Sequence, residues 1–223
     1  MFPGRNGSGG KLERMVRLRV RIRFCKQDDL RLIGHRDLMR CFERLFRRAS
    51  LPLGMSQGFH PKPRMTFPLP LAVGIEGADE VMELEMAESI SAQDLLARLK
   101  SHAPRGLTPL AVEILAPDEK KARAQSASYE VPIPPPLDSG LGERIERLLA
   151  QSTLTITRIH GRSPIDLRPM LEELSFRQGA LNMRLKIKQE GCAGPRDVLA
   201  ALGLEDLESR GVHLTRTVVE LGH

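Results

Sequence analysis

Aromatic residues, cysteine and long apolar runs are all scarce in this chain of 223 residues, which has no Trp, one Tyr and three Cys. Its core must therefore be built mainly from aliphatic side chains. Cys25, Cys41 and Cys192 are too far apart for a disulfide framework or for a zinc or iron–sulfur ligand set. No run approaches the roughly 20 apolar residues of a membrane helix. We expect a soluble, cytoplasmic chain that binds no metal or cofactor itself and does not contact a membrane.

Several catalytic motifs are absent as well. The sequence contains no phosphate-binding loop of the GxxxxGK[ST] or GxGxxG type and no HExxH. It therefore predicts neither ATP hydrolysis, dinucleotide binding nor zinc-dependent hydrolysis.

Positive charge is present, and it is concentrated in one region. Residues 14–64 hold 14 Lys and Arg against 4 Asp and Glu, a net of +10, whereas the whole chain carries +6. A regional surplus favours a surface that binds nucleic acid or another polyanion more than uniform basicity does. The alternative is a solvated helix face that only keeps the protein soluble.

A helix and a stiff loop carry much of this charge. Six apolar residues recur at three- and four-residue steps and predict a buried helical stripe: Leu38, Cys41, Phe42, Leu45, Phe46 and Ala49. Pro52 should end the helix near Ser50. The loop GMSQGFHPKPR at 54–64 follows, shaped by Gly58 and Pro61. We predict that its cations and those of the helix contact phosphates and that Phe59 stacks on a base; these cations are Arg40, Arg44, Arg47, Arg48, Lys62 and Arg64.

The pattern of residues 16–115 predicts the order strand, helix, strand, strand, helix, strand. The strands are expected at 16–24, 65–75, 81–86 and 107–115, and the helices at 35–50 and 92–102. This is the ferredoxin-like βαββαβ order, in which the first strand lies between the third and the fourth. Arginines of the first strand should then form an ion-pair ladder with Glu83, Glu85 and Glu113. Leu110, Val112 and Ile114 should be buried.

The same order returns after a polar segment. Weaker patterns predict strands at 129–133, 154–159, 171–176, 181–188 and 212–221, and helices at 141–149 and 195–202. We therefore predict an α+β protein of tandem ferredoxin-like domains at 15–117 and 129–223, with a linker at 118–128 and a disordered leader at 1–14. A duplicated fold creates a shared surface between its units, where a ligand commonly lies.

Two groups of side chains are candidates for chemistry. His35, Asp37 and His60 belong to the basic helix and loop, and two histidines near a phosphate could cleave RNA by general acid–base catalysis without a metal. Alternatively, His35 and Asp37 cap the helix and His60 packs in the loop. Asp166 and Arg168 form a second polar cluster, which could bind a polar group or belong to an ordinary turn.

The segment LIGHRDLMRCFERLFRRASLPLGMSQGFHPKPRMTFPLPLAVGIEG at 32–77 resembles the radical-SAM-associated (radical SAM-linked) protein family of bacteria. The residues that carry this resemblance are His35, Asp37, Leu38, Met39, Arg47, Arg48, Ser56, Gly58, Phe59, Pro61, Pro63 and Pro70, with IDLRP at 165–169. Members are often adjacent or fused to a B12-binding radical SAM protein. The resemblance therefore implies a radical SAM partner that holds the iron–sulfur cluster and S-adenosylmethionine.

Together these observations lead to a hypothesis about function. We expect an accessory, non-catalytic protein that binds RNA or another anionic substrate for a radical SAM partner enzyme. One alternative is a metal-independent endoribonuclease that uses His35 and His60, and another is a module that only docks a protein partner.

Overall fold

The computed structural model describes residues 18–156, 164–188 and 192–222, which form one large mixed sheet, a separate two-stranded sheet and four α-helices. The strands of the sheet are β1 (Leu18–Lys26), β2 (Met65–Thr66), β3 (Glu76–Met86), β4 (Leu107–Ile114), β5 (Arg123–Pro132), β8 (Leu171–Arg177), β9 (Ala180–Lys186) and β10 (Thr215–Gly222). The helices are α1 (His35–Arg48), α2 (Ala92–His102), α3 (Leu141–Leu149) and α4 (Pro195–Ala201). The short strands β6 (Thr155–Ile156) and β7 (Ile165–Asp166) pair with each other. The predicted α+β class is confirmed.

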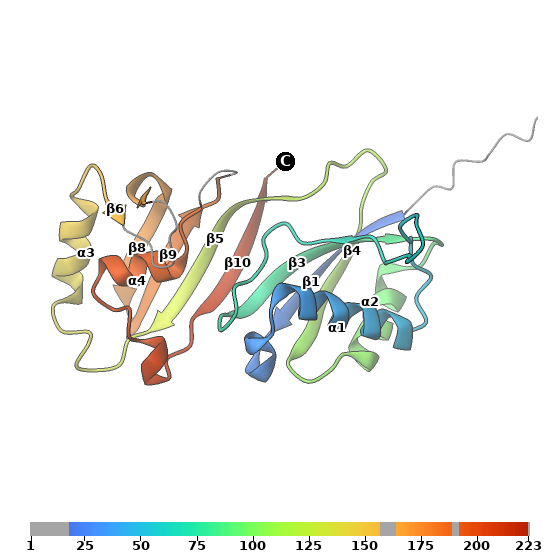
Figure 1. Cartoon of the computed structure of the whole chain (residues 1–223), viewed down its shortest axis with the longest axis horizontal. Coiled ribbons are helices and arrows are strands. Elements are labelled where there is room, and N and C mark those ends of the chain that lie inside the picture. The colour runs from blue at the N-terminus through green and yellow to red at the C-terminus, as the bar shows by residue number, and fades with distance from the viewer. Residues whose placement is uncertain (1–17, 157–163, 189–191, 223) are drawn as a thin grey trace, which may run out of the picture.

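The sheet repeats one strand order in its two halves. The first half runs β4-β1-β3-β2 and the second β10-β5-β9-β8, and every pairing within a half is antiparallel. A short parallel ladder joins the halves, with Thr215 opposite Glu76 and Arg216 opposite Gly77. Figure 1 shows this junction near the middle of the molecule, where β3 and β10 meet. The sheet is therefore continuous from β4 to β8.

The basic helix of the first half packs as its apolar spacing predicts. All six residues of its predicted stripe are buried, against the apolar face of β1 and against Leu95 and Leu99 of α2. Gly34 is the N-cap of α1, and no side chain caps this end. The capping role considered for His35 and Asp37 is therefore wrong.

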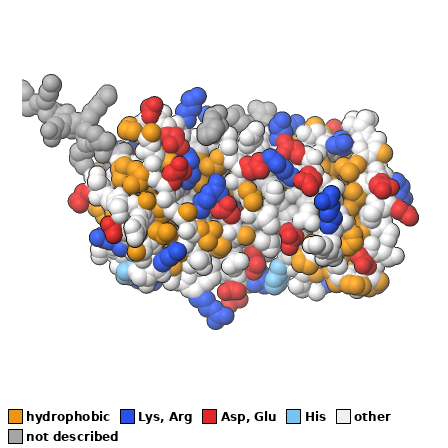
Figure 2. All heavy atoms as spheres, turned by 180° about the vertical axis from the view of Figure 1, so that it is seen from behind, with side chains coloured by type: hydrophobic (Ala, Val, Ile, Leu, Met, Phe, Trp, Pro, Cys, Tyr) orange, Lys and Arg blue, Asp and Glu red, His pale blue; other side chains and the backbone are white. Residues whose placement is uncertain are grey.

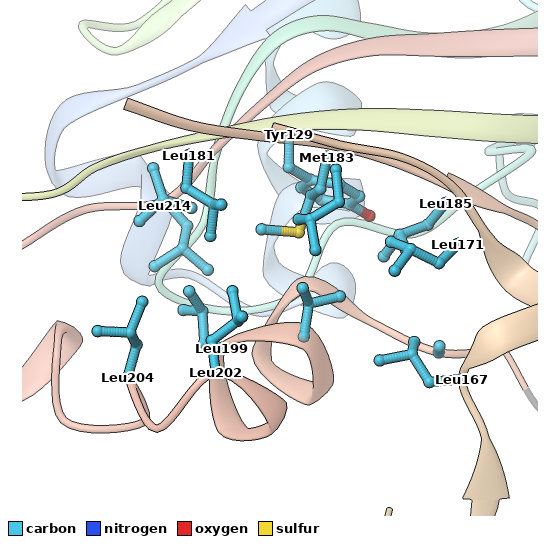
Figure 3. Close-up of a cluster of buried hydrophobic side chains, with 14 of the residues drawn as sticks. Tyr129, Leu167, Leu171, Leu181, Met183, Leu185, Leu199, Leu202, Leu204 and Leu214 are labelled. Carbon is cyan, nitrogen blue, oxygen red and sulfur yellow. The ribbon is translucent and has the colours of Figure 1, made fainter. Parts of the chain in front are cut away.

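A second core lies beneath the other half of the sheet. Leu181 and Met183 of β9 lie on the side of Leu199 of α4 and its C-cap residue Leu202, and Leu185 lies beside Leu171 (Figure 3). The segment between β2 and β3 also reaches this core, where its Leu71 and Ile75 are buried. The two halves therefore share packing as well as a sheet. No helix in the described ranges is long and apolar enough to cross a membrane.

The first strand of the second half starts earlier than predicted. β5 begins at Arg123, inside the segment 118–128 that was expected to be a linker. Ser126 and Ala127 are completely buried within it, and the Ser126 hydroxyl donates to Glu220 Oε2 at 2.8 Å. Small and polar residues produce no apolar alternation, yet they pair with β9 and β10 along this strand. The apolar pattern therefore predicted only the end of β5, from residue 129 on.

The predicted burial of β4 is wrong at two positions. Leu110 and Ile114 are 39% and 42% exposed. β4 is the edge of the sheet, and its ladder skips Leu110, since Arg23 lies opposite Ala111 and Phe24 opposite Pro109. This bulge places Leu107 and Pro109 on the buried face instead.

Three further predictions concern element bounds. The extended segment expected at 65–75 is a strand only at Met65–Thr66. Of the strand expected at 154–159, the structure shows Thr155–Ile156, and the rest from 157 on lies outside the described residues. The leader predicted at 1–14 also lies outside them. The strands expected at 171–176 and 181–188 are confirmed, and they form the hairpin of β8 and β9, with positive φ at Gln178 and Gly179.

Candidate anion-binding surface

Ion pairs neutralise the arginine row of β1, as the predicted ladder requires. Arg21 contacts Glu83 at 3.0 Å, Glu113 at 3.2 Å and Glu119 at 2.7 Å. Arg23 pairs with Asp79 at 2.6 Å. In Figure 2, basic and acidic side chains are interspersed over the side of the molecule facing away from the view of Figure 1. These arginines hold strands together, so we do not assign them to an anion site.

The outer face of α1 carries five exposed arginines, and two of them are already engaged. Arg40 Nη1 donates to Asp37 Oδ1 at 3.1 Å, in a pair that is more than half exposed. Arg48 Nη2 donates to the carbonyl oxygen of His102 at the end of α2, at 2.8 Å. Arg36 and Arg47 have no side-chain partner among the described residues. Arg40 is only weakly held, because an exposed pair of this kind contributes at most about 1 kcal/mol.

Arg44 lies beside a thiol on the same helix. Burial raises the pKa of Cys41, and the neighbouring guanidinium groups of Arg44 and Arg48 offset this only in part. Arg44 itself is exposed, so its remaining donors face solvent.

The loop after α1 is a closed hairpin whose tip projects into solvent. The Ser56 N–H donates to the Lys62 carbonyl at 2.8 Å, and the Arg64 N–H donates to the Gly54 carbonyl at 2.9 Å. Phe59 at the tip is completely exposed, and Gly58 has a φ of +134°, which favours glycine. The tip therefore presents an aromatic ring and Lys62 outward, on a fixed base.

Arg64 helps to build that base. Its Nε donates to the Met55 carbonyl at 3.2 Å, and its guanidinium pairs with Glu85 at 3.5 Å. The predicted phosphate contact from Arg64 is therefore less available than one from Lys62, which is exposed.

The loop sequence at 54–58, GMSQG, fits the GxSxG pattern of serine hydrolases. That pattern requires a serine on a sharp turn between a strand and a helix. Here the Ser56 hydroxyl accepts the Lys62 N–H at 3.0 Å within a hairpin, and among the described residues no histidine contacts it. The match therefore predicts no nucleophile.

His35 and His60 are not joined in the part of the chain that the structure describes. His35 packs edge-on against Phe67 with ring centroids 5.0 Å apart, and its Nδ1 is buried without a hydrogen-bond partner among the described residues. Burial lowers the pKa of His35, and the charge of Lys26 lowers it further. His60 lies exposed in the loop, and Asp37 pairs with Arg40. This arrangement lacks the contact that would orient an acid–base pair.

Asp166 and Arg168 form a turn. Asp166 Oδ1 accepts the N–H of Leu154 at 2.8 Å and the N–H of Arg168 at 3.1 Å. The Arg168 side chain donates to the Leu171 carbonyl at 3.4 Å. Both side chains thus form hydrogen bonds with nearby backbone groups, which favours an ordinary turn over a ligand site.

A buried charged cluster at the junction of the halves is absent from the sequence-based candidates. Arg216 of β10 pairs with Glu80 of β3, and Lys26 lies nearby and donates to the Ile33 carbonyl at 3.1 Å. The sequence contains one signal for this cluster, because Lys26 occupies the next inward position in the alternation of β1. In the structure its side chain is 1% exposed. A lysine in register with apolar residues indicates a buried partner.

The described residues contain no group of three or more His, Cys, Asp or Glu side chains placed to hold a metal ion. Cys25, Cys41 and Cys192 form no disulfide bond among the described residues. Burial raises the pKa of Cys25, with a further contribution from the charges of Asp79 and Glu80.

Comparison with known proteins identifies one matching family. Residues 19–195 match the family described as "Uncharacterized protein conserved in bacteria (DUF2344)". No curated protein matches the sequence.

Two solved structures show weak similarity. One is a crystal structure of an unknown protein from Galdieria sulphuraria, with 12% identity, 93% of this chain and 99% of that chain covered, and a TM-score of 0.29. The other is a putative glycine cleavage system transcriptional repressor, with 12% identity, 89% and 95% covered, and a TM-score of 0.24. With TM-scores this low, neither similarity bears on function.

Proposed function

This chain belongs to the bacterial family DUF2344, and we propose that it binds single-stranded RNA, or a similar polyanion, and presents it to a partner enzyme without acting on it chemically. The proposed partner is the radical SAM protein that the sequence resemblance implies. We also infer that the two halves are tandem ferredoxin-like units. The support for this is that each half repeats the same antiparallel strand order, with helices following its first and third strands.

The exposed cations of α1 and the loop are the observation that carries the proposal. Arg36, Arg44, Arg47 and Lys62 are exposed, and no acidic side chain pairs with any of them in the described residues. Arg40 adds a fifth cation, held only by an exposed pair. Cations without internal partners lose little when they bind a phosphate, because no existing ion pair has to break.

The chemistry of this surface favours backbone contacts over base recognition. Arginine forms two parallel hydrogen bonds with a phosphate. Of six cations of α1 and the loop, five are arginines, the set being Arg36, Arg40, Arg44, Arg47, Lys62 and Arg64. Phe59 offers one exposed ring for stacking. We therefore expect binding with little sequence preference.

A binding experiment with matched variants tests the proposal. The affinity of labelled single-stranded RNA is measured by fluorescence anisotropy for the wild type and for Arg44→Ala, Arg47→Ala, Lys62→Ala. The control, Arg147→Ala, Arg177→Ala, Arg210→Ala, removes the same charge from exposed positions in the second half. The first variant should make the negative slope of log K against log salt shallower by about 2, and the control should leave it unchanged.

The result against the proposal is equally clear. If both variants weaken binding equally, the effect comes from net charge and the α1 surface is not the site. RNA that is cut during incubation with EDTA, with cutting lost in His35→Ala, would instead support the endoribonuclease alternative.

A further inference from the structure

A groove at the junction of the two halves contains cations that the α1 surface does not explain. We define the junction groove as the hollow between residues 66–68, the start of β5 at 121–125, and the ends of β9 and β10. Its volume is about 800 Å³. This volume lies within the range of cavities that enclose a small ligand. The groove is large enough for a short single-stranded segment.

The charge of the junction groove is of one sign. Its lining residues include Lys121, Arg123 and Lys188 and no Asp or Glu. All three cations are exposed, and their side chains have no ion pair or hydrogen bond with other described residues. A concave surface with three uncompensated positive charges concentrates anions, since nothing within the groove offsets the charges.

A smaller hollow of about 260 Å³ connects this groove with the loop after α1. It shares Thr66 and Lys121 with the groove and includes Arg64 at the base of the loop. Its two acidic side chains have basic partners, because Glu83 pairs with Arg21 at 3.0 Å and Glu85 with Arg64 at 3.5 Å. Lys121, which the hollow shares with the groove, is thus its one cation without an ion pair among the described residues, and its positive charge faces the hollow that reaches the base of the loop.

The apolar lining of the groove argues against base stacking. Phe67 is its one aromatic residue, and that ring packs against Phe24 at 6.3 Å and Phe42 at 5.8 Å between centroids. The ring thus packs against the core of the first half, so it is not available to stack on a base. The groove offers charges to phosphates and small aliphatic contacts to the rest of a strand.

We propose that the junction groove binds the phosphate backbone of a single-stranded RNA segment that continues from the loop after α1, so that one strand spans both halves of the protein. This inference rests on the proposed function, because it extends the same RNA from one surface to the next. It assigns phosphate contacts to Lys121, Arg123 and Lys188, which lie outside the basic region of the sequence.

Two RNA lengths test the inference on the full chain. Anisotropy is measured with oligonucleotides of about 4 and about 16 nucleotides. The groove variant Lys121→Ala, Arg123→Ala, Lys188→Ala is compared with wild type and with Arg147→Ala, Arg177→Ala, Arg210→Ala. We expect the groove variant to reduce the salt slope for the longer RNA by about 2 and to bind the shorter RNA like wild type.

The outcomes separate this inference from the proposed function. If wild type binds the longer RNA and the groove variant matches the control variant, the groove assignment is wrong and the proposed function stands. If wild type binds neither RNA, both are wrong. Thermal unfolding of each variant accompanies the measurement, and Lys121→Gln alone, which should show about a third of the effect, serves if the triple variant does not fold.

Discussion

Arg216 on β10 donates from Nε to Glu80 Oε1 on β3 at 2.7 Å, in a pair whose side chains are only 2% and 5% exposed. Arg216 Nη2 also donates to the Leu69 carbonyl at 2.8 Å. Burial alone would lower the pKa of Arg216, but the hydrogen bond and charge of Glu80 outweigh it and raise the pKa. One charged side chain thus joins the last strand to two segments of the first half.

Glu80→Gln tests the contribution of this pair to stability. The substitution keeps the shape of the side chain and leaves Arg216 buried without a counter-charge. Loss of one partner from a buried pair costs about 3–5 kcal/mol, and urea unfolding measures it. The matched control is Asp37→Asn, which breaks the exposed pair with Arg40 and should cost less than about 1 kcal/mol. Equal losses in the two variants would contradict the account of the junction.

Gly77→Ala should weaken the same pair from the opposite side. A Cβ at Gly77 would lie 2.4 Å from Glu80 Cγ and 2.7 Å from its Oε1, so the carboxylate must move away from Arg216. We expect a loss of about 1–3 kcal/mol in the free energy of unfolding. The double variant Gly77→Ala, Glu80→Gln should lose less free energy of unfolding than the sum of the losses in the two single variants, because both substitutions act on one contact. Full additivity in this double-mutant cycle would show that they act independently.

His35 should make stability depend on pH. Burial and the charge of Lys26 lower its pKa in the folded state, whereas the unfolded value is about 6.5. As pH falls through about 6.5, the unfolded chain binds a proton that the folded chain does not, so stability decreases until the folded pKa is reached. Urea unfolding at about pH 7.5 and about pH 5.5 should show a smaller difference for His35→Asn than for wild type. His60→Asn should keep the wild-type difference, because it retains His35.

Much of the fold could be predicted from periodicity. The helix α1 and the strand β1 have one buried face each, so the spacing of their apolar residues indicates both the type of element and its buried side. β5 was partly missed, because Ala127 fills its core position with a small side chain and Ser126 is buried with hydrogen bonds to Glu220 and Arg184, so this segment shows no apolar alternation. Leu110 was misplaced because the bulge lies at its own position, so that Leu107 and Pro109 before it take the buried positions, and no local pattern marks the bulge.

The candidate site was predictable only in part. Clustered arginines on one helix indicate an exposed cationic face whatever the tertiary structure is. Engagement of Arg48 by the His102 carbonyl and of Arg64 by Glu85 depends on contacts between segments far apart in sequence. The junction groove brings Lys121 and Lys188 together from opposite parts of the second half, so only the folded chain reveals it.

The salt dependence of RNA binding by the wild-type chain tests the central claim most directly. Anisotropy with total bacterial RNA at several salt concentrations gives the slope of log K against log salt. If about four phosphates are neutralised on the α1 surface alone, the slope should be roughly −3, and three further phosphate contacts in the junction groove should make it roughly −5. A slope near zero, or no binding by a chain shown to be folded, would contradict RNA binding by this protein.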